Sequence, residues 1–137
     1  MMLFVATKPV AFSTAAKLDI SLKTRDIGSK DSGYWDEKAP SKMSWTASSD
    51  ALMCDDLTGT GNSTIADLYT AMEARTPVAL VFATKTGTSP DYTASAVAGK
   101  TKFSGSGYIT SLSLSAPDND SATYSISFEG TGALVMA

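Results

Sequence analysis

The side chains of this sequence that can do chemistry are carboxylates, hydroxyls and aromatic rings, because the chain has no histidine and one cysteine, Cys54. Without histidine, a nucleophile–histidine–acid triad and a cysteine–histidine zinc site are both excluded. A single cysteine also excludes a disulfide within the chain. We interpret Cys54 as a small, partly buried apolar residue in a reducing compartment.

Acidic residues cluster in a way that raises two possible chemistries, calcium binding and acid–base hydrolysis of glycosides. The clusters are Asp36-Glu37, Asp50 with Asp55-Asp56, and Asp118-Asn119-Asp120. The aspartate clusters lack the alternating ligands and closing glutamate of a calcium loop. Adjacent carboxylates point apart or are solvated, and sequence cannot give the separation that glycoside hydrolysis requires. We therefore predict no metal, no cofactor and no enzymatic activity, and we interpret the last cluster as part of a turn.

Two short glycine motifs, Gly59-Thr60-Gly61 and Gly105-Ser106-Gly107, are candidates for phosphate binding. Neither is followed by lysine at the spacing of a phosphate-binding loop, and neither lies between a strand and a helix. We interpret both motifs as bends.

Three aromatic residues, Tyr34, Trp35 and Trp45, could form a platform for a sugar or for another protein. Trp45 heads an alternating segment, which favours a place in the core. Tyr34 and Trp35 lie in a polar segment, where a core position and a contact surface are both open.

The composition indicates one globular domain, residues 1–137, of 14.3 kDa. Hydrophobic residues make up 43% and charged residues only 18%, against about 25% charged in typical domains. Such a low fraction of charged residues is expected for a protein whose surface is largely covered by partners. Ser/Thr-rich β-domains that do not assemble also show it. The net charge of −3 argues against nucleic-acid binding. The opening MMLFVATKPVAF resembles neither a leader nor a membrane span, so we expect a cytosolic location before assembly.

Alternating apolar residues predict two half-buried strands, Ala16–Arg25 and Met43–Leu52. In the first, Leu18, Ile20 and Leu22 share one face. The segment between them is rich in glycine and charge and spans roughly fifteen residues, which is longer than an ordinary hairpin loop. We predict an ordered loop with a contact role.

A helix is predicted after a cap at Ser63 or Thr64. Asp67 lies three residues after Thr64, as a capping box requires, and the helical spacing is followed by Ile65, Leu68, Tyr69 and Met72. Thr76-Pro77 is predicted to end this helix. The apolar segment Val78–Ala83 is then predicted to be a strand buried on both sides.

Tyr108–Ala116 and Thr123–Glu129 alternate around a Pro117–Asp120 turn and predict a terminal hairpin. Residues 85–106 are sparse in apolar side chains and are interpreted as a long hairpin or excursion. The chain is thus predicted to be mainly β, an antiparallel β-sandwich or barrel of about seven strands with one flanking α-helix.

Two parts of the sequence resemble the major tail (tail tube) proteins of long-tailed bacteriophages. The first is Ile20–Trp45, with Asp26, the block Ser29-Lys30-Asp31-Ser32-Gly33-Tyr34-Trp35, and Trp45 at the head of the next strand. The second is the ending, with Gly107–Leu112, Ala116–Ser125 and Gly130-Thr131-Gly132-Ala133-Leu134. The resemblance covers nearly the whole chain, except that residues 85–106 match nothing in the family.

The resemblance implies a β-rich subunit that forms hexameric rings, stacked into a tube that delivers DNA. The expected partners are copies of itself, other tail proteins and DNA that passes without specific binding, with no membrane and no cofactor. The expected location is the virion tail, and the host cytoplasm before assembly. We expect an N-terminal arm (1–13), an assembly loop (28–42) and an excursion (85–106). The expected subunit contacts are Lys30, Asp31, Tyr34, Trp35, Asp36 and Tyr92.

Two alternatives remain open from the sequence. One is a tube protein of a phage-derived injection or secretion machine. The other is a carbohydrate-binding β-sandwich in which Tyr34, Trp35 and Tyr92 form the platform.

Overall fold

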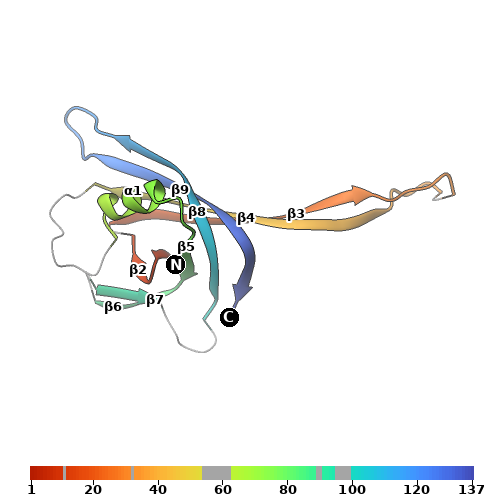
Figure 1. Ribbon diagram of the computed structural model, residues 1–137, viewed down its shortest axis with the longest axis horizontal. Coiled ribbons are helices and arrows are strands. Elements are labelled where there is room, and N and C mark those ends of the chain that lie inside the picture. Colours follow the sequence, from red (N-terminus) through yellow and green to blue (C-terminus); the bar gives the residue numbers. More distant parts are fainter. Residues whose placement is uncertain (11, 32, 54–62, 89–90, 95–99) are drawn as a thin grey trace.

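The computed structural model describes residues 1–10, 12–31, 33–53, 63–88, 91–94 and 100–137. Its main feature is one seven-stranded antiparallel sheet in the order β2-β1-β5-β8-β9-β4-β3, with a separate two-stranded sheet, β6-β7 (Figure 1). The strands are β1 (Met2–Val5), β2 (Lys8–Pro9), β3 (Ser13–Asp26), β4 (Lys38–Leu52), β5 (Val78–Ala83), β6 (Lys85–Thr88), β7 (Asp91–Ala94), β8 (Lys102–Ser115) and β9 (Thr123–Met136). The helix is α1 (Ile65–Glu73).

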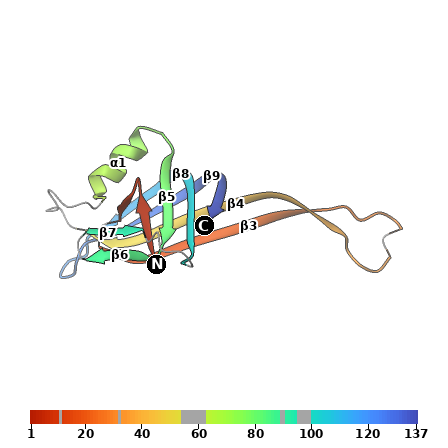
Figure 2. The ribbon, with the colours of Figure 1, turned by 90° about the horizontal axis from the view of Figure 1, so that it is seen from below.

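The large sheet curls, so that β1 contacts β3 although the two are far apart in strand order. Helix α1 lies over the β1–β5 side of this curled sheet (Figure 2). The prediction of a mainly β fold with about seven strands and one flanking helix is confirmed. The buried core consists of Leu3, Val5, Val10, Trp45, Ala47, Ala51, Leu68, Leu80, Tyr124, Ile126 and Phe128.

Alternation along β4 and β9 places one side-chain face in this core. Ala47 pairs with Phe128 and Ala51 with Tyr124 across the two strands, and all four are buried. Burial also raises the pKa of Tyr124 to about 12. The terminal hairpin predicted from the sequence is therefore confirmed, with β8 and β9 both longer than expected.

Trp45 belongs to the core, with 5% of its surface exposed. Its indole ring lies over two glycines, because a Cβ on Gly105 would come within 2.7 Å of its Cζ2 and a Cβ on Gly130 would overlap the ring. Its Nε1 donates a hydrogen bond to the carbonyl oxygen of Gly132 at 3.3 Å. At Gly132 the backbone has a φ of +75°, next to a register shift between β8 and β9. The Gly130–Gly132 segment thus bends within a continuing strand.

Helix α1 begins as predicted. Thr64 accepts a hydrogen bond from the Asp67 backbone, and the Asp67 carboxylate accepts one from the Thr64 backbone at 3.1 Å, which completes the capping box. Leu68 is the fully buried residue of the helix. The following strand, β5, is confirmed, but it is less buried than predicted, since Leu80 and Ala83 are buried while Ala79 is exposed.

The strands β3 and β4 extend well beyond the body of the sheet. Strand β4 pairs with β9 only from Thr46 to Leu52, so the preceding residues pair with β3 alone and project as a two-stranded arm, residues 20–44 (Figure 1). Ile20, Leu22 and Met43 are 46%, 51% and 70% exposed. The prediction of a half-buried strand is wrong beyond Leu18, because no other part of the described chain covers the apolar face of the arm.

Three segment boundaries also differ from expectation. Residues 1–13, expected as an N-terminal arm, contain β1 and β2 of the sheet, with Leu3, Phe4 and Val5 buried. The loop expected at 28–42 is shorter, because β4 already begins at Lys38. The 85–106 excursion contains β6 and β7 and the first residues of β8, while residues 95–99 lie outside the described part.

In the described residues, no helix is long and apolar enough to cross a membrane.

Candidate functional site

The carboxylate clusters do not form a catalytic or metal site in the part of the chain that the structure describes. No group of three or more histidine, cysteine, aspartate or glutamate side chains there is placed to hold a metal ion. Asp118 and Asp120 are exposed in a turn around Asn119, whose φ is +66°. Cys54, Asp55, Asp56 and the Gly59–Gly61 motif lie outside the described residues. The candidate functional features are therefore surfaces.

The tip of the arm, residues 27–37, presents two aromatic rings to solvent. Tyr34 and Trp35 are 104% and 86% exposed, so the alternative that they belong to the core is excluded. A backbone hydrogen bond from Ile27 to Glu37 (3.0 Å) and an ion pair between Lys38 and Asp26 (3.5 Å) close the base of the tip. The two strands of the arm are thus held together up to the base of the tip.

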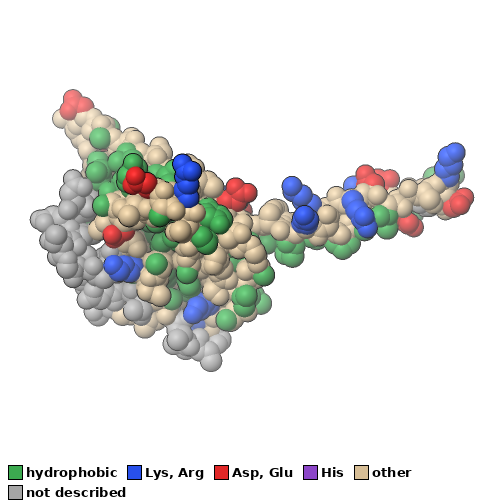
Figure 3. Space-filling view, in the orientation of Figure 1, with side chains coloured by type: hydrophobic (Ala, Val, Ile, Leu, Met, Phe, Trp, Pro, Cys, Tyr) green, Lys and Arg blue, Asp and Glu red, His purple; other side chains and the backbone are tan. Residues whose placement is uncertain are grey.

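Five of the six residues predicted as subunit contacts share this tip: Lys30, Asp31, Tyr34, Trp35 and Asp36. Their side chains add both signs of charge around the rings, and side chains of both signs lie along the arm (Figure 3). The sixth, Tyr92, is on β7 opposite Gly87, in the body of the molecule. Because β7 and the tip lie at opposite ends (Figures 1 and 2), Tyr92 cannot share a sugar-binding platform with Tyr34 and Trp35.

An apolar stripe on the arm continues the core face of the sheet. Ile20 pairs with Trp45, and Leu22 pairs with Met43, so these side chains lie on one face of the hairpin. Three of them are exposed, whereas Trp45 is buried at the base of the arm. Sequence analysis assigned Ile20 and Leu22 to a core, since alternation shows which residues share a face but not whether anything covers it.

The outer edge of β3 pairs with no other strand in the part of the chain that the structure describes. β3 is the last strand of the sheet order and contains 14 residues, whereas the opposite edge strand, β2, contains two. A long exposed edge offers a row of backbone donors and acceptors to another chain. This edge is the more extensive pairing surface of the two.

The side of the β8-β9-β4-β3 sheet that faces away from the core is covered by hydroxyl groups. Its members, here called the hydroxyl face, are Ser44, Thr46, Ser48, Ser111, Ser113, Ser115, Thr123, Ser125 and Ser127. Ser21 and Ser44 hydrogen-bond through their hydroxyls at 2.8 Å, and Ser125 Oγ donates to Asp50 Oδ1 at 2.6 Å.

The charges within the hydroxyl face are sparse and mainly negative. Lys17 is paired with Asp19 at 2.9 Å, and two more carboxylates come from Asp50, which pairs across the strands with Ser125, and Glu129, which pairs with Thr46. The alternation of serine in β8 and β9 is visible in the sequence, but the predicted hairpin rests on the inward-facing residues alone. It takes the register of four strands to show that the hydroxyls form one continuous surface.

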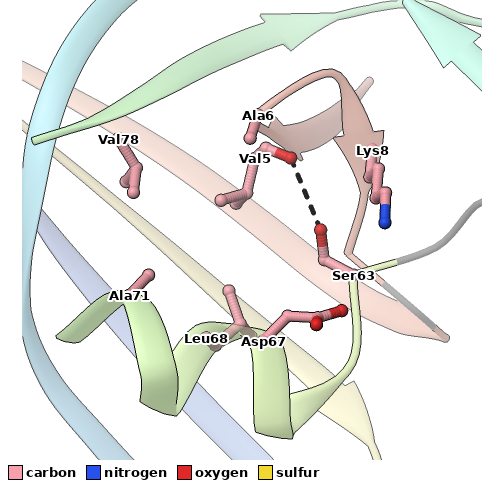
Figure 4. A pocket seen from close by; sticks show the side chains of 8 residues that line it. All are labelled: Val5, Ala6, Lys8, Ser63, Asp67, Leu68, Ala71 and Val78. Atoms are coloured by element: carbon pink, nitrogen blue, oxygen red, sulfur yellow. Dashed lines mark hydrogen bonds between the residues drawn. The ribbon is translucent and has the colours of Figure 1, made fainter. Parts of the chain in front are cut away.

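An apolar pocket of about 220 Å³ lies between α1 and the β1–β2 turn, at the end of the molecule opposite the arm tip. Figure 4 shows Val5, Leu68, Ala71 and Val78 lining it, with Lys8 and Asp67 at its rim. Ser63, 3% exposed, donates to the Val5 carbonyl oxygen at 3.4 Å and fixes one wall. Sequence reasoning missed this pocket, because its lining comes from four separate segments.

The sequence profile of the family described as "Phage tail tube protein" matches residues 5–136. No curated protein sequence matches the chain.

Solved structures with the same fold come from tail-like assemblies. A chain in the virion of a native gene transfer agent particle has a TM-score of 0.72 and 18% identity, over 98% of this chain and 95% of that chain. A chain in the tail of an empty gene transfer agent particle, refined with C6 symmetry, has a TM-score of 0.70 and 19% identity, over 95% and 85%. A chain in the sheath–tube complex of PVC, an extracellular contractile injection system, has a TM-score of 0.66 and 14% identity, over 99% and 86%.

Proposed function

The chain belongs to the phage tail tube protein family, and we propose on that basis that it assembles with copies of itself into stacked hexameric rings that form a hollow tube for DNA delivery. The subunit would reside in the host cytoplasm before assembly and in the virion tail afterwards, in contact with other tail proteins. Proteins of this family are structural subunits, and we propose no catalytic activity and no cofactor.

The observation that carries the proposal is the arm. From Ile20 to Asp26, at about 3.3 Å per residue, it extends roughly 20 Å beyond the sheet. A compact domain of this length has a radius of gyration of about 14 Å, so the arm reaches past the body of its own subunit. The arm exposes apolar and aromatic side chains far from the core of its subunit. Such exposure is unfavourable in a monomer, but in an assembly these side chains can be buried against another subunit.

The edges of the sheet support ring closure. A long unpaired β3 edge is a liability in a lone chain, because it offers a template for uncontrolled pairing. Head-to-tail contact between unlike surfaces of identical subunits closes into a ring when the rotation per subunit fits. Six copies related in this way would cover every β3 edge, and stacking of rings would cover the arms.

The hydroxyl face suits the wall of a channel through which DNA slides. Strong binding to DNA depends on lysine and arginine that displace counterions from phosphates. Where β3 and β4 belong to the body of the sheet, this face carries hydroxyls, one paired lysine, Lys17, and three carboxylates, Asp19, Asp50 and Glu129, so it would form a hydrated wall that binds phosphate weakly. Lys23 and Lys42 lie on the same side farther out, on the arm. We therefore place the core and α1 toward the outside of the tube.

The experiment that tests the proposal replaces the arm tip. Asp26 and Lys38 are cross-strand partners, so residues 27–37 can be exchanged for a two-residue Asn-Gly turn without changing the register. Wild-type protein at high concentration should form tubes in negative-stain electron microscopy. The short-tip variant should keep its circular dichroism spectrum and melting temperature and stay monomeric in sedimentation. Normal tubes from this variant would refute the role of the arm.

A tube of an injection machine is the second candidate, because the fold is shared with the sheath–tube complex of a contractile injection system. The two functions differ in what passes through the channel. Nuclease-protected DNA in tails purified from producing cells supports the phage function, and tails that contain protein cargo and no DNA support the injection function.

A further inference from the structure

We propose that the pocket between α1 and the β1–β2 turn receives the Trp35 side chain from the arm of a second copy. The inference rests on the proposed function, because it assigns a receptor to the arm. The arm tip, which carries Trp35, and helix α1, which lines the pocket, lie at opposite ends of one subunit (Figures 1 and 2), so the contact joins different chains and propagates head to tail.

The size and lining of the pocket fit one large apolar side chain. Its volume of about 220 Å³ is below the roughly 300–1,000 Å³ of sites for small-molecule ligands and cofactors. Val5, Leu68, Ala71 and Val78 give it apolar walls from the helix on one side and two strands on the other (Figure 4). A ring that enters it extends the core cluster to which Val5 and Leu68 already belong.

Trp35 is the side chain that we expect to enter this pocket. It is 86% exposed in the isolated chain, at the end of an arm that projects away from the body (Figure 1). Burial of a tryptophan removes on the order of 150–250 Å² from water, and tryptophan is the residue most enriched at the energetic centres of protein interfaces. A buried indole N–H needs an acceptor, and the Asp67 carboxylate stands at the rim of the pocket.

Charges around the two surfaces are complementary. Lys8 stands exposed at the rim and forms no ion pair with any described residue. Asp36 and Glu37 follow Trp35 directly at the tip, so a docked ring brings a carboxylate toward the Lys8 ammonium. Asp67, also at the rim of the pocket, carries a charge opposite to that of Lys8. Lys30 at the arm tip has the sign that complements Asp67.

Cross-linking between copies tests the contact directly. In a Cys54→Ser background, one variant carries Asp36→Cys and a second carries Lys8→Cys, so that a disulfide replaces the proposed ion pair while Trp35 stays in place. Mixed and oxidised with copper–phenanthroline, the two should give a covalent dimer. Adding Trp35→Ala to the first variant should abolish the link, whereas adding Tyr34→Ala should keep it. An Asp118→Cys variant, with its cysteine in the exposed β8–β9 turn, should give no dimer with Lys8→Cys.

Filling the pocket gives a second readout. Ala71→Phe should leave the melting temperature within a few degrees of wild type and raise the concentration needed for tube formation about 30-fold, the effect of losing one interface centre. Tubes that form normally from both Ala71→Phe and Trp35→Ala, with no dimer in the cysteine assay, overturn the docking and leave the proposed function intact. A wild-type protein that stays monomeric at every concentration overturns the proposed function and the docking with it.

Discussion

The indole ring of Trp45 lies flat on the backbone of Gly130, where a Cβ would overlap it, and its Nε1 donates to the carbonyl oxygen of Gly132. This arrangement joins β4 to β9 where the arm leaves the sheet. The body therefore anchors the arm through one ring and two glycines.

Gly130→Ala should destabilise the fold, because the new methyl group forces the Trp45 ring out of its place. Overpacking of a core costs about 1–3 kcal/mol, and we expect the upper part of that range in chemical denaturation. Gly132→Ala is the matched control, since nothing lies within 4 Å of its Cβ and only its φ of +75° opposes the change. It should cost about 1 kcal/mol. Equal losses at the two positions would contradict the ring contact.

The two tryptophans should report on different events. With Trp45→Phe, the remaining fluorescence comes from Trp35, which is exposed in the monomer and should be strongly quenched by acrylamide. Quenching should fall on assembly as Trp35 becomes buried. With Trp35→Phe, the signal comes from buried Trp45 and should be protected in both states. Trp35 that stays fully quenchable in assembled tubes would exclude it from a subunit contact.

The apolar stripe of the arm should matter for assembly and not for folding. Leu22→Ser combined with Met43→Ser removes side chains that are 51% and 70% exposed, so the free energy of unfolding should change by less than about 0.5 kcal/mol. The same variant should fail to form tubes. Ile126→Ala, at a fully buried position, should instead cost about 2–5 kcal/mol. A large loss of stability in the arm variant would show that the stripe is covered within one chain.

High pH should destabilise the protein through Tyr124. Its pKa is raised to about 12 from 10 by burial, so the folded state keeps the proton longer than the unfolded state. The stabilising effect is complete below pH 10 and is lost as the pH rises from about 10 to about 12. Across this pH range the free energy of unfolding of the wild type should therefore fall by about 2–3 kcal/mol more than that of Tyr124→Phe. Tyr34→Phe, at a fully exposed position, should follow wild type. If the free energy of unfolding of the wild type and of Tyr124→Phe changed with pH in parallel, the assignment of this pH dependence to Tyr124 would be refuted.

Cations on the hydroxyl face should convert the channel wall into a DNA-binding surface. Ser48 and Ser127 are cross-strand partners, and changing both to lysine adds two phosphate-binding charges per subunit. Tubes of this variant should retain nuclease-protected DNA at low salt and release it at high salt. The Ser48→Asn/Ser127→Asn pair should retain none. Bound DNA that nuclease fully degrades would place this face on the outside of the tube.

Much of the local structure was predictable from the sequence. Three predicted features depend only on residues close to one another in the chain. They are the Thr64/Asp67 capping box, the alternation of Tyr124, Ile126 and Phe128, and the Pro117–Asp120 turn. Such patterns depend on backbone geometry that recurs in every protein, so they can be read without the rest of the molecule.

The limits of strands β4 and β9 were not predictable to the same degree. β4 begins at Lys38, before the predicted Met43, because Lys38, Ala39 and Pro40 pair with the end of β3, and β9 continues past Gly130 because β8 and the Trp45 ring hold the bend in place. In both cases the stabilising partner is distant in sequence, and local propensity gives no sign of it.

By itself the sequence determined that the chain is mainly β with one capped helix, that it lacks histidine-based chemistry, and which residues alternate together on each strand. Only the tertiary structure decided which of those faces are covered: Trp45 is buried on glycine while Trp35, Ile20 and Leu22 remain exposed. The physical reason is that periodicity is a property of one strand, whereas burial, the hydroxyl face and the pocket beside α1 depend on which segments the fold brings next to one another.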